Sequence, residues 1–248
     1  MNKIYCGDCV KLMKELEDNT IDLTVTSPPY DNLRNYNGYS FDFESIAKEL
    51  FRITKDGGVV VWVVGDRKEK GCRTLTQFKQ GLFFKEIGFE VHDVMIWRKP
   101  NPMPYILKNC YTPSFEYMFV LSKGKPKTTN IIEEPCKYAG KTIQTNTSNN
   151  ESMMGYRGRG ETKKTKIKSN VWDYVVAGTN HGHPAIFPEK LAEDHILSWS
   201  NEGDLILDPM CGSGTTCKMA KLNNRNFIGM DCSEEYCSIA RERLFALK

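Results

Sequence analysis

Features that would assign a chain to the membrane or to the secretory pathway are missing from this sequence. No run of about 18 apolar residues occurs, so we expect no transmembrane helix. Residues 1–5 lack the apolar stretch of a signal peptide, which predicts a cytoplasmic protein.

Metal-binding and disulfide signatures are also scarce. The nine cysteines are an odd number and are scattered along the chain. Cys6 and Cys9 form one C-x-x-C pair, but no second such pair and no histidine pair lies at zinc-finger spacing. We therefore favour free thiols in a reducing cytoplasm over a metal or redox site, and we assign no metal ligands.

The net charge is small but unevenly distributed. The 248 residues carry a formal charge of +3, yet residues 123–168 hold eleven Lys/Arg against four Asp/Glu, which leaves −4 for the rest. Between residues 123 and 170 Lys, Thr, Asn and Gly dominate, and no hydrophobic period is visible. A basic segment on a mildly acidic body predicts contact with a polyanion in one place.

Strand-like and helix-like segments alternate over the rest of the chain, which predicts an α/β fold with a doubly wound sheet. Strands are expected at residues 3–6, 21–25, 59–64, 89–97, 115–121, 205–208 and 226–230, and helices at 10–17, 43–53, 74–87, 189–200, 217–222 and after Ser233. The helix at 74–87 is expected to bury Leu75, Phe78, Leu82, Phe83 and Ile87. Only a short polar link joins strands 89–97 and 115–121, which predicts an antiparallel pair.

A glycine-rich loop, residues 209–216 (PMCGSGTT), joins the strand that ends at Asp208 to a helix. Gly212 and Gly214 let the backbone approach a ligand, and the start of the helix offers N–H groups without helical partners. Asp231 stands 17 residues beyond Gly214, at the end of the next strand. A carboxylate there suits hydrogen bonds to two ribose hydroxyls, so the unit predicts a nucleotide-like cofactor.

Other readings of this loop fit less well. A dinucleotide dehydrogenase requires a third glycine where Cys217 stands, and no Gly-Lys-Ser/Thr completes a P-loop. The acid at Asp208 disfavours a pyrophosphate and suits a cofactor that carries a sulfonium and an ammonium. The remaining alternative is a tight turn without a ligand.

A second distinctive stretch, Thr26-Ser27-Pro28-Pro29-Tyr30, follows the strand at 21–25. The two prolines donate no backbone hydrogen bonds and hold φ near one value, so the turn is stiff and its carbonyls stay outside the strand ladder. A hydroxyl on one side and an aromatic ring on the other suit a flat group that carries an NH2. Taken alone, the stretch is equally compatible with an ordinary loop.

Together the two stretches resemble the amino-methyltransferases that use S-adenosylmethionine to methylate an exocyclic NH2 of a DNA base. The catalytic turn precedes the cofactor loop, an order similar to the permuted class called beta, and the resemblance covers nearly the whole chain outside residues 124–182. It implies a mostly parallel, seven-stranded, Rossmann-like sheet with one antiparallel strand near an edge. It also implies that strand 3–6 lies beside strand 226–230.

The resemblance implies a role for each matching residue. Ser27 and the Pro28 carbonyl would accept hydrogen bonds from the target amine, Pro29 would stiffen the turn, and Tyr30 would stack on a flipped base. Asp8 with Cys9 would contact the adenine edge of the cofactor, and Phe187 with Pro188 its methionine end. The expected cofactor contacts are Asp8, Cys9, Thr26, Phe187, Pro188, Asp208, Met210, Gly212, Ser213, Gly214, Thr215 and Asp231.

The target base is less strongly indicated than the reaction. In this family Ser at position 27 is associated more with cytosine N4 and Asp more with adenine N6, so we favour cytosine N4. Both bases present the same N–C=N geometry, and adenine N6 is the alternative.

Three parts are expected within this chain: a catalytic part (1–122), a small basic insertion (123–182) and a cofactor-binding part (183–248). The family places sequence-reading elements in such an insertion, whose expected phosphate and guanine contacts are Arg157, Arg159, Lys163 and Lys164. The alternative is a solvated loop. Arg34, after the catalytic turn, and Arg98 with Lys99, in a proline-stiffened turn, are expected to add DNA contacts.

The expected partner is double-stranded DNA; a cognate restriction endonuclease and a homodimer are further candidates. Two other functions compete. An RNA methyltransferase would be favoured by a separate RNA-binding domain, and the sequence shows none. A catalytically dead DNA regulator that binds the cofactor would have no reason to keep the Ser27-Pro28-Pro29-Tyr30 turn together.

Overall fold

In the computed structural model the chain divides into two compact units, Met1–Asn130 with Asn170–Lys248, and Ile131–Ser169. The structure describes residues 2–28, 41–102, 104, 110–140, 142–143, 160–176 and 187–247. Five residues with predicted roles lie outside these ranges: Pro29, Tyr30, Arg34, Arg157 and Arg159. Within the described ranges, no helix combines the length and the apolar character that crossing a bilayer requires.

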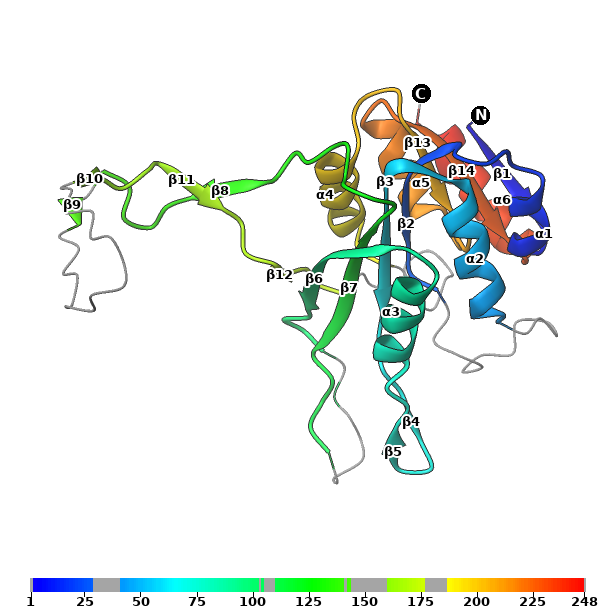
Figure 1. The fold of residues 1–248 in the computed structure, drawn as a ribbon, viewed down its shortest axis with the longest axis horizontal. Helices are drawn as coiled ribbons and strands as arrows, with labels where there is room; N and C mark the ends of the chain where they lie inside the picture. The colour runs from blue at the N-terminus through cyan, green and yellow to red at the C-terminus, as the bar shows by residue number, and fades with distance from the viewer. Residues whose placement is uncertain are drawn as a thin grey trace. The chain divides into compact units, whose positions relative to one another are not determined.

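The larger unit is built on an eight-stranded sheet with the order β1-β14-β13-β2-β3-β7-β6-β12 (Figure 1). Its strands are β1 (Lys3–Cys6), β2 (Ile21–Thr26), β3 (Thr54–Val64), β6 (Glu90–Arg98), β7 (Phe115–Ser122), β12 (Val171–Asp173), β13 (Leu205–Asp208) and β14 (Asn226–Asp231). All neighbouring pairs are parallel except those that β7 makes with β3 and β6. The predicted sheet, its single antiparallel strand and the adjacency of β1 and β14 are thus confirmed.

The sheet has one strand more than the seven predicted. β12 extends the sheet beyond β6, with Val171 opposite Ile96 and Asp173 opposite Arg98. Its buried Trp172, which is 5% exposed, anchors this edge. A strand of three residues is too short to show the period-two pattern by which strands are recognised in a sequence.

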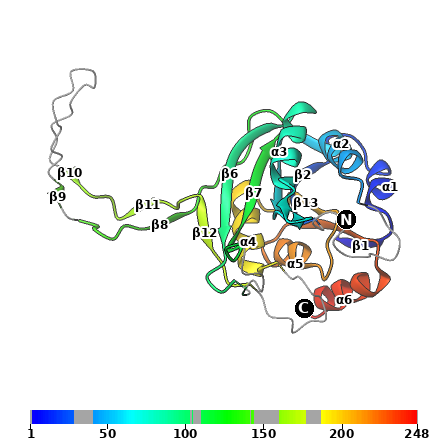
Figure 2. The same cartoon turned by 90° about the horizontal axis from the view of Figure 1, so that it is seen from below.

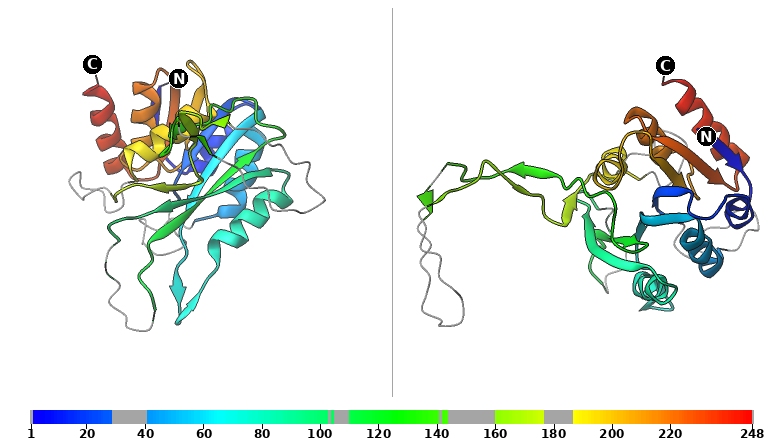
Figure 3. Two further views of the ribbon diagram at one scale, coloured as in Figure 1. Left: turned by 90° about the vertical axis from the view of Figure 1, so that its left-hand side faces the viewer. Right: turned by 45° about the horizontal axis from the view of Figure 1, so that its top comes forward.

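Two layers of helices cover the sheet (Figures 2 and 3). One layer contains α1 (Cys9–Lys14), α2 (Phe43–Ile53) and α3 (Thr76–Glu86), and the other contains α4 (Glu189–Trp199), α5 (Thr215–Leu222) and α6 (Glu234–Phe245). Val59–Val64 of β3 is buried between the layers, as its uninterrupted apolar run predicted. Side chains next to two of the helices cap their N-termini. Asp8 accepts a hydrogen bond from Lys11 N at the start of α1, and Ser233 accepts one from Tyr236 N at the start of α6.

Helix α3 buries only part of the face that the sequence predicted. Of the five apolar residues expected inside, Leu75, Phe78 and Leu82 are exposed, whereas Phe83 and Ile87 are partly buried and pack against the core. On the buried side, Gln80 Oε1 accepts a hydrogen bond from Trp62 Nε1 at 2.8 Å. Gly81 lies so close to the Phe119 ring that a Cβ would come within 2.9 Å of it. A buried hydrogen bond and a close approach therefore set the orientation, and hydrophobic spacing reveals neither.

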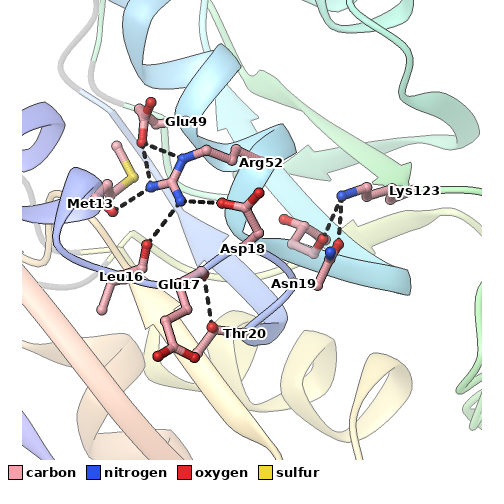
Figure 4. Close-up of polar contacts among 10 residues, drawn as sticks. Met13, Leu16, Glu17, Asp18, Asn19, Thr20, Glu49, Arg52 and Lys123 are labelled. Atoms are coloured by element: carbon pink, nitrogen blue, oxygen red, sulfur yellow. Dashed lines mark hydrogen bonds and ion pairs between the residues drawn. The ribbon is translucent and has the colours of Figure 1, made fainter.

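Arg52, near the end of α2, forms hydrogen bonds and ion pairs with the end of α1 and the segment that follows it (Figure 4). Its guanidinium bonds to two backbone carbonyls and two carboxylates: Met13 O (2.8 Å), Leu16 O (2.9 Å), Asp18 Oδ1 (2.6 Å) and Glu49 Oε2 (2.7 Å). Met13 O also accepts from Leu16 N at 3.0 Å, so Arg52 adds a second donor there and also binds the Leu16 carbonyl just beyond α1. Because Asp8 is the N-cap of α1, Arg52 also steadies an element that begins at the candidate site.

The smaller unit is an antiparallel ladder. β8 (Glu133–Pro135) pairs with β11 (Thr165–Ile167), and β9 (Thr142–Ile143) pairs with β10 (Gly160–Glu161). The side chains of β8 and β11 are mostly exposed, so these strands need no apolar alternation, which explains the lack of a period in this region. A separate hairpin, β4 (Lys68–Glu69) with β5 (Cys72–Arg73), belongs to the larger unit.

Candidate active site

The carboxyl ends of four neighbouring parallel strands meet at one edge of the sheet, in the order β1, β14, β13, β2. β14 ends at Asp231, β13 at Asp208 and β2 at Thr26, and β1 is followed closely by Asp8. The fold thereby unites the glycine-rich loop with the start of the proline-rich turn. In open α/β sheets ligands bind at this edge, so the edge is the candidate active site.

The glycine-rich loop is tightly folded against its neighbours. Gly212 and Gly214 have φ of +49° and +78°, values that favour glycine. A Cβ on Gly214 would come within 2.8 Å of Ala240 Cβ on α6. The Asp231 carboxylate accepts hydrogen bonds from Gly212 N and from Ser233 N, both at 2.9 Å. Two backbone amides therefore fix the orientation of this carboxylate beside the loop.

Asp208 is buried where the glycine-rich loop meets the end of β2. Its Oδ1 accepts hydrogen bonds from Thr26 Oγ1 at 2.8 Å and from Met210 N at 3.2 Å. Burial raises the pKa of Asp208 to about 6, although these hydrogen bonds act in the opposite direction. Thr26 belongs to β2 and Met210 to the loop, so one carboxylate ties the two functional stretches together.

Asp8 and Cys9 lie at the end of β1. Asp8 Oδ1 accepts from Lys11 N at 2.9 Å, which sets the side chain at the start of α1. Burial, and then the charge of Asp8, raises the pKa of the Cys9 thiol to about 12, which keeps this thiol neutral. All nine cysteines are free.

The structure describes only the beginning of the proline-rich turn, Ser27 and Pro28. Ser27 is half-buried and Pro28 is buried, directly after the last residue of β2. Across the sheet, Pro188 is the N-cap residue of α4, and its carbonyl accepts from Leu191 N and Ala192 N at 3.1 and 3.2 Å. Phe187 precedes it and is half-buried.

Two of the predicted basic contacts in the larger unit, Arg98 and Lys99, are held in ion pairs. Arg98 Nε donates to Asp173 Oδ1 at 2.6 Å, and this bond lowers the pKa of the Asp173 carboxyl. Lys99 Nζ donates to the buried Glu116 and lies 4.6 Å from the centre of the Trp97 ring. In the smaller unit, Lys163 and Lys164 are exposed next to β11.

Three charged residues beside the loop have no counterpart in the sequence-based prediction. Glu189 Oε1 accepts from Lys218 Nζ at 2.6 Å and from Arg243 Nη2 at 2.8 Å. Arg243 Nη1 also donates to Ser213 O at 2.6 Å and to Ser213 Oγ at 2.9 Å. Burial raises the pKa of Glu189, but its bonds to Lys218 and Arg243 outweigh this and lower it. These residues are far apart in the chain and sit on three helices, so no local motif could have pointed to them.

Comparison with known protein families gives a clear match. The family described as DNA methylase, N6_N4_Mtase, matches residues 21–242. The orphan methyltransferase M.BamHII of Bacillus amyloliquefaciens is 53% identical over 246 residues, which cover 94% of this chain and 92% of the relative. The type II methyltransferase M.BglII of Bacillus subtilis is 29% identical over 269 residues, covering 98% and 69%.

Solved structures share the fold. The PvuII DNA methyltransferase, titled cytosine-N4-specific, superposes with a TM-score of 0.74 at 22% identity, covering 97% of this chain and 85% of that one. The M1.HpyAVI–SAM complex gives a TM-score of 0.64 at 23% identity and covers 98% of each chain. At these identities the similarity establishes the architecture alone.

Proposed function

The chain belongs to the N6_N4_Mtase family of DNA methylases, and on that premise we propose that it methylates the N4 amine of cytosine in double-stranded DNA. Its enzyme class is S-adenosylmethionine-dependent DNA methyltransferase. The observation that carries the proposal is the shared Asp208 contact, which joins the start of the Ser27-Pro28 turn to the glycine-rich loop. The serine at position 27, which is associated in this family more with cytosine N4, favours cytosine N4 over adenine N6.

The residues at the edge fit S-adenosylmethionine better than a phosphorylated cofactor. Asp8, Asp208 and Asp231 lie around the loop. Three carboxyls would repel a pyrophosphate, whereas they attract a sulfonium and an ammonium. When bound, S-adenosylmethionine supplies a methyl group activated by the positive sulfur.

We assign the parts of the cofactor to this edge as follows. Asp231, oriented by two backbone amides, would accept hydrogen bonds from the ribose hydroxyls. Asp8 and the neutral Cys9 would contact the adenine edge, and Phe187 with Pro188 the methionine end. The remaining contacts would come from Thr26, Asp208, Met210, Gly212, Ser213, Gly214 and Thr215.

Ser27 and Pro28 would prepare the target amine. The exocyclic nitrogen is a weak nucleophile because its lone pair is delocalised into the ring. Hydrogen bonds from the NH2 to Ser27 Oγ and to the Pro28 carbonyl favour a pyramidal nitrogen and release that lone pair. The nitrogen becomes more acidic once it is methylated, so its proton passes to water without a strong base. Positioning and electrostatics would supply most of the rate.

The base must leave the duplex to reach this turn, and Tyr30 would stack on it. In the smaller unit, Lys163 and Lys164, together with Arg157 and Arg159, would contact DNA phosphates. Arg34 would add a contact near the turn. Arg98 and Lys99 would reach DNA only when their pairs with Asp173 and Glu116 open.

The assignment of the base is tested with purified protein, deuterium-labelled S-adenosylmethionine and DNA from a methylation-deficient host. We expect labelled N4-methylcytosine among the nucleosides identified by mass spectrometry. N6-methyladenine would overturn the choice of base and keep the fold and the cofactor. No labelled product from protein that binds the cofactor would overturn the proposed reaction.

Three further expectations accompany the proposal. We expect the protein to act in the cytoplasm on its DNA substrate. A homodimer would appear in light scattering at twice the 28.4 kDa mass of the chain. A cognate restriction endonuclease would be recognised because methylation by this protein protects DNA from its cleavage.

A further inference from the structure

The structure assigns to Arg243 the role of a positioning residue that holds the cofactor loop in its binding conformation through Ser213 and Glu189. The guanidinium bridges two elements that lie on either side of it. Nη1 bonds to the carbonyl and the hydroxyl of Ser213 in the loop, and Nη2 bonds to Glu189 in the first turn of α4. This inference rests on the proposed cofactor role of the loop.

The contact is built into the fold and is not a chance surface pair. The Arg243 side chain is 15% exposed, and its partner Glu189 also forms an ion pair with Lys218 of α5. The same face of α6 carries Ala240, against which Gly214 packs. Since 243 and 240 are three residues apart, α6 contacts the loop with a small side chain at one position and a bidentate donor one turn later.

The bridge links two groups of expected cofactor contacts. Ser213, Gly214 and Thr215 lie on one side, and Arg243 Nη1 is also 3.5 Å from Thr215 Oγ1. Glu189 directly follows Phe187 and Pro188, which are expected at the methionine end. One guanidinium thus fixes the spacing between the loop and the start of α4. A planar, two-sided donor is required for this, and an ammonium offers only a point charge.

The effect should appear in cofactor affinity and not in the methyl-transfer step. Arg243 does not reach the Ser27-Pro28 turn in any described contact, so its loss should leave the geometry of the amine unchanged. For Arg243→Met we expect the KM for S-adenosylmethionine to rise about tenfold, the size expected for losing a charged hydrogen bond that orders a binding loop. The kcat and the KM for DNA should stay within about twofold of the original values.

The experiment compares Arg243→Met and Arg243→Lys with the matched variant Arg241→Met. Arg241 lies two positions earlier on α6 and bonds to Glu234 and to the Ile4 carbonyl, away from the loop. We expect the lysine variant to give an intermediate KM, because lysine can satisfy Ser213 or Glu189 but not both. Arg241→Met should leave KM unchanged. Thermal unfolding without ligand identifies any variant that merely fails to fold.

Two results would overturn the inference. One is an unchanged KM for S-adenosylmethionine in both Arg243 variants that fold. The other is a loss confined to kcat, or one equalled by Arg241→Met. A failure of the Arg243 inference must be separated from a failure of the proposed cofactor site. The variant Asp231→Asn, measured in parallel by calorimetric titration with S-adenosylmethionine, separates the two. If Asp231→Asn binds the cofactor normally, the proposed cofactor site is wrong. If Asp231→Asn loses cofactor binding while the Arg243 variants bind the cofactor normally, only the role of Arg243 is wrong.

Discussion

Asp208 gives a prediction in which stability and cofactor binding change in opposite directions. The group is buried, and its pKa is raised to about 6. Moving the pKa of an aspartate from about 3.9 to about 6 corresponds to about 3 kcal/mol, because each unit is worth about 1.4 kcal/mol. The protonated form is favoured in the folded chain, so this stability is present below pH 4 and is lost as the pH rises through 6.

The perturbation is Asp208→Asn, which can keep the acceptor for Thr26 and Met210 without the charge. Urea unfolding of cofactor-free protein at several pH values gives the difference in unfolding free energy between variant and wild type. That difference isolates residue 208 from all other titrating groups. We expect it to shift in favour of the variant by about 3 kcal/mol between pH 4 and pH 7, with most of the change around pH 4 to 6.

The same variant should bind S-adenosylmethionine more weakly at pH 7, since it removes one of the carboxylates that attract the positive cofactor. Wild-type affinity should fall about tenfold between pH 7 and pH 5, as Asp208 takes up its proton, and the affinity of the variant should fall less. A free-energy difference that does not change with pH would refute the raised pKa. A difference that shifts toward the wild type as the pH rises would refute the sign of the argument.

Three further predictions concern the loop, the Arg52 contacts and the catalytic turn. Gly214→Ala should lower the unfolding free energy, measured by urea unfolding, by about 2–3 kcal/mol, and Gly203→Ala should lower it by about 1 kcal/mol. Both glycines have a positive φ, but only a Cβ at position 214 would meet Ala240. Arg52→Met should lower the unfolding free energy by about 2 kcal/mol in the same assay, because it removes the bonds to the Met13 and Leu16 carbonyls. Lys48→Met removes an exposed ion pair with Glu44 at 3.8 Å on the same helix and should change the unfolding free energy by at most about 0.5 kcal/mol. Ser27→Leu should abolish methyl transfer in the labelled-nucleoside assay and leave calorimetric binding of S-adenosylmethionine unchanged.

Each of these pairs has an outcome that contradicts its reasoning. Equal losses for the two glycine variants would mean that α6 does not restrict the loop. An Arg52→Met loss no larger than that of Lys48→Met would mean that the carbonyl bonds of Figure 4 contribute nothing. If Ser27→Leu also lost cofactor binding, the separation of the turn from the cofactor site would be wrong.

The parts of the fold that local chemistry determines could be predicted from the sequence. The apolar run of β3, the Ser233 cap and the glycine-rich loop each carry their signal within a few residues. The parts set by tertiary contact could not. The face of α3 depends on a hydrogen bond between Gln80 and Trp62, and the three-residue β12 depends on pairing with β6.

In the candidate site, too, the sequence predicts what local chemistry determines but not the contacts between distant residues. Asp8, Asp208 and Asp231 could be placed at one edge because each follows a predicted parallel strand, whose carboxyl ends must meet there. The pairing of Arg98 with Asp173 and the bridge from Arg243 to Glu189 join residues that are 75 and 54 positions apart. A charged residue in a sequence shows no sign of which distant charge will neutralise it, so Arg98 was assigned to DNA on composition alone.

A crystal structure of the protein with S-adenosylmethionine tests the central claim most directly, which is that one edge of the sheet holds the cofactor and presents the target amine. The account predicts ribose hydroxyls on Asp231, the adenine edge at Asp8 and Cys9, and the methyl group directed toward Ser27 and Pro28. A cofactor bound elsewhere, or one at this edge whose methyl group points away from Ser27, would contradict it.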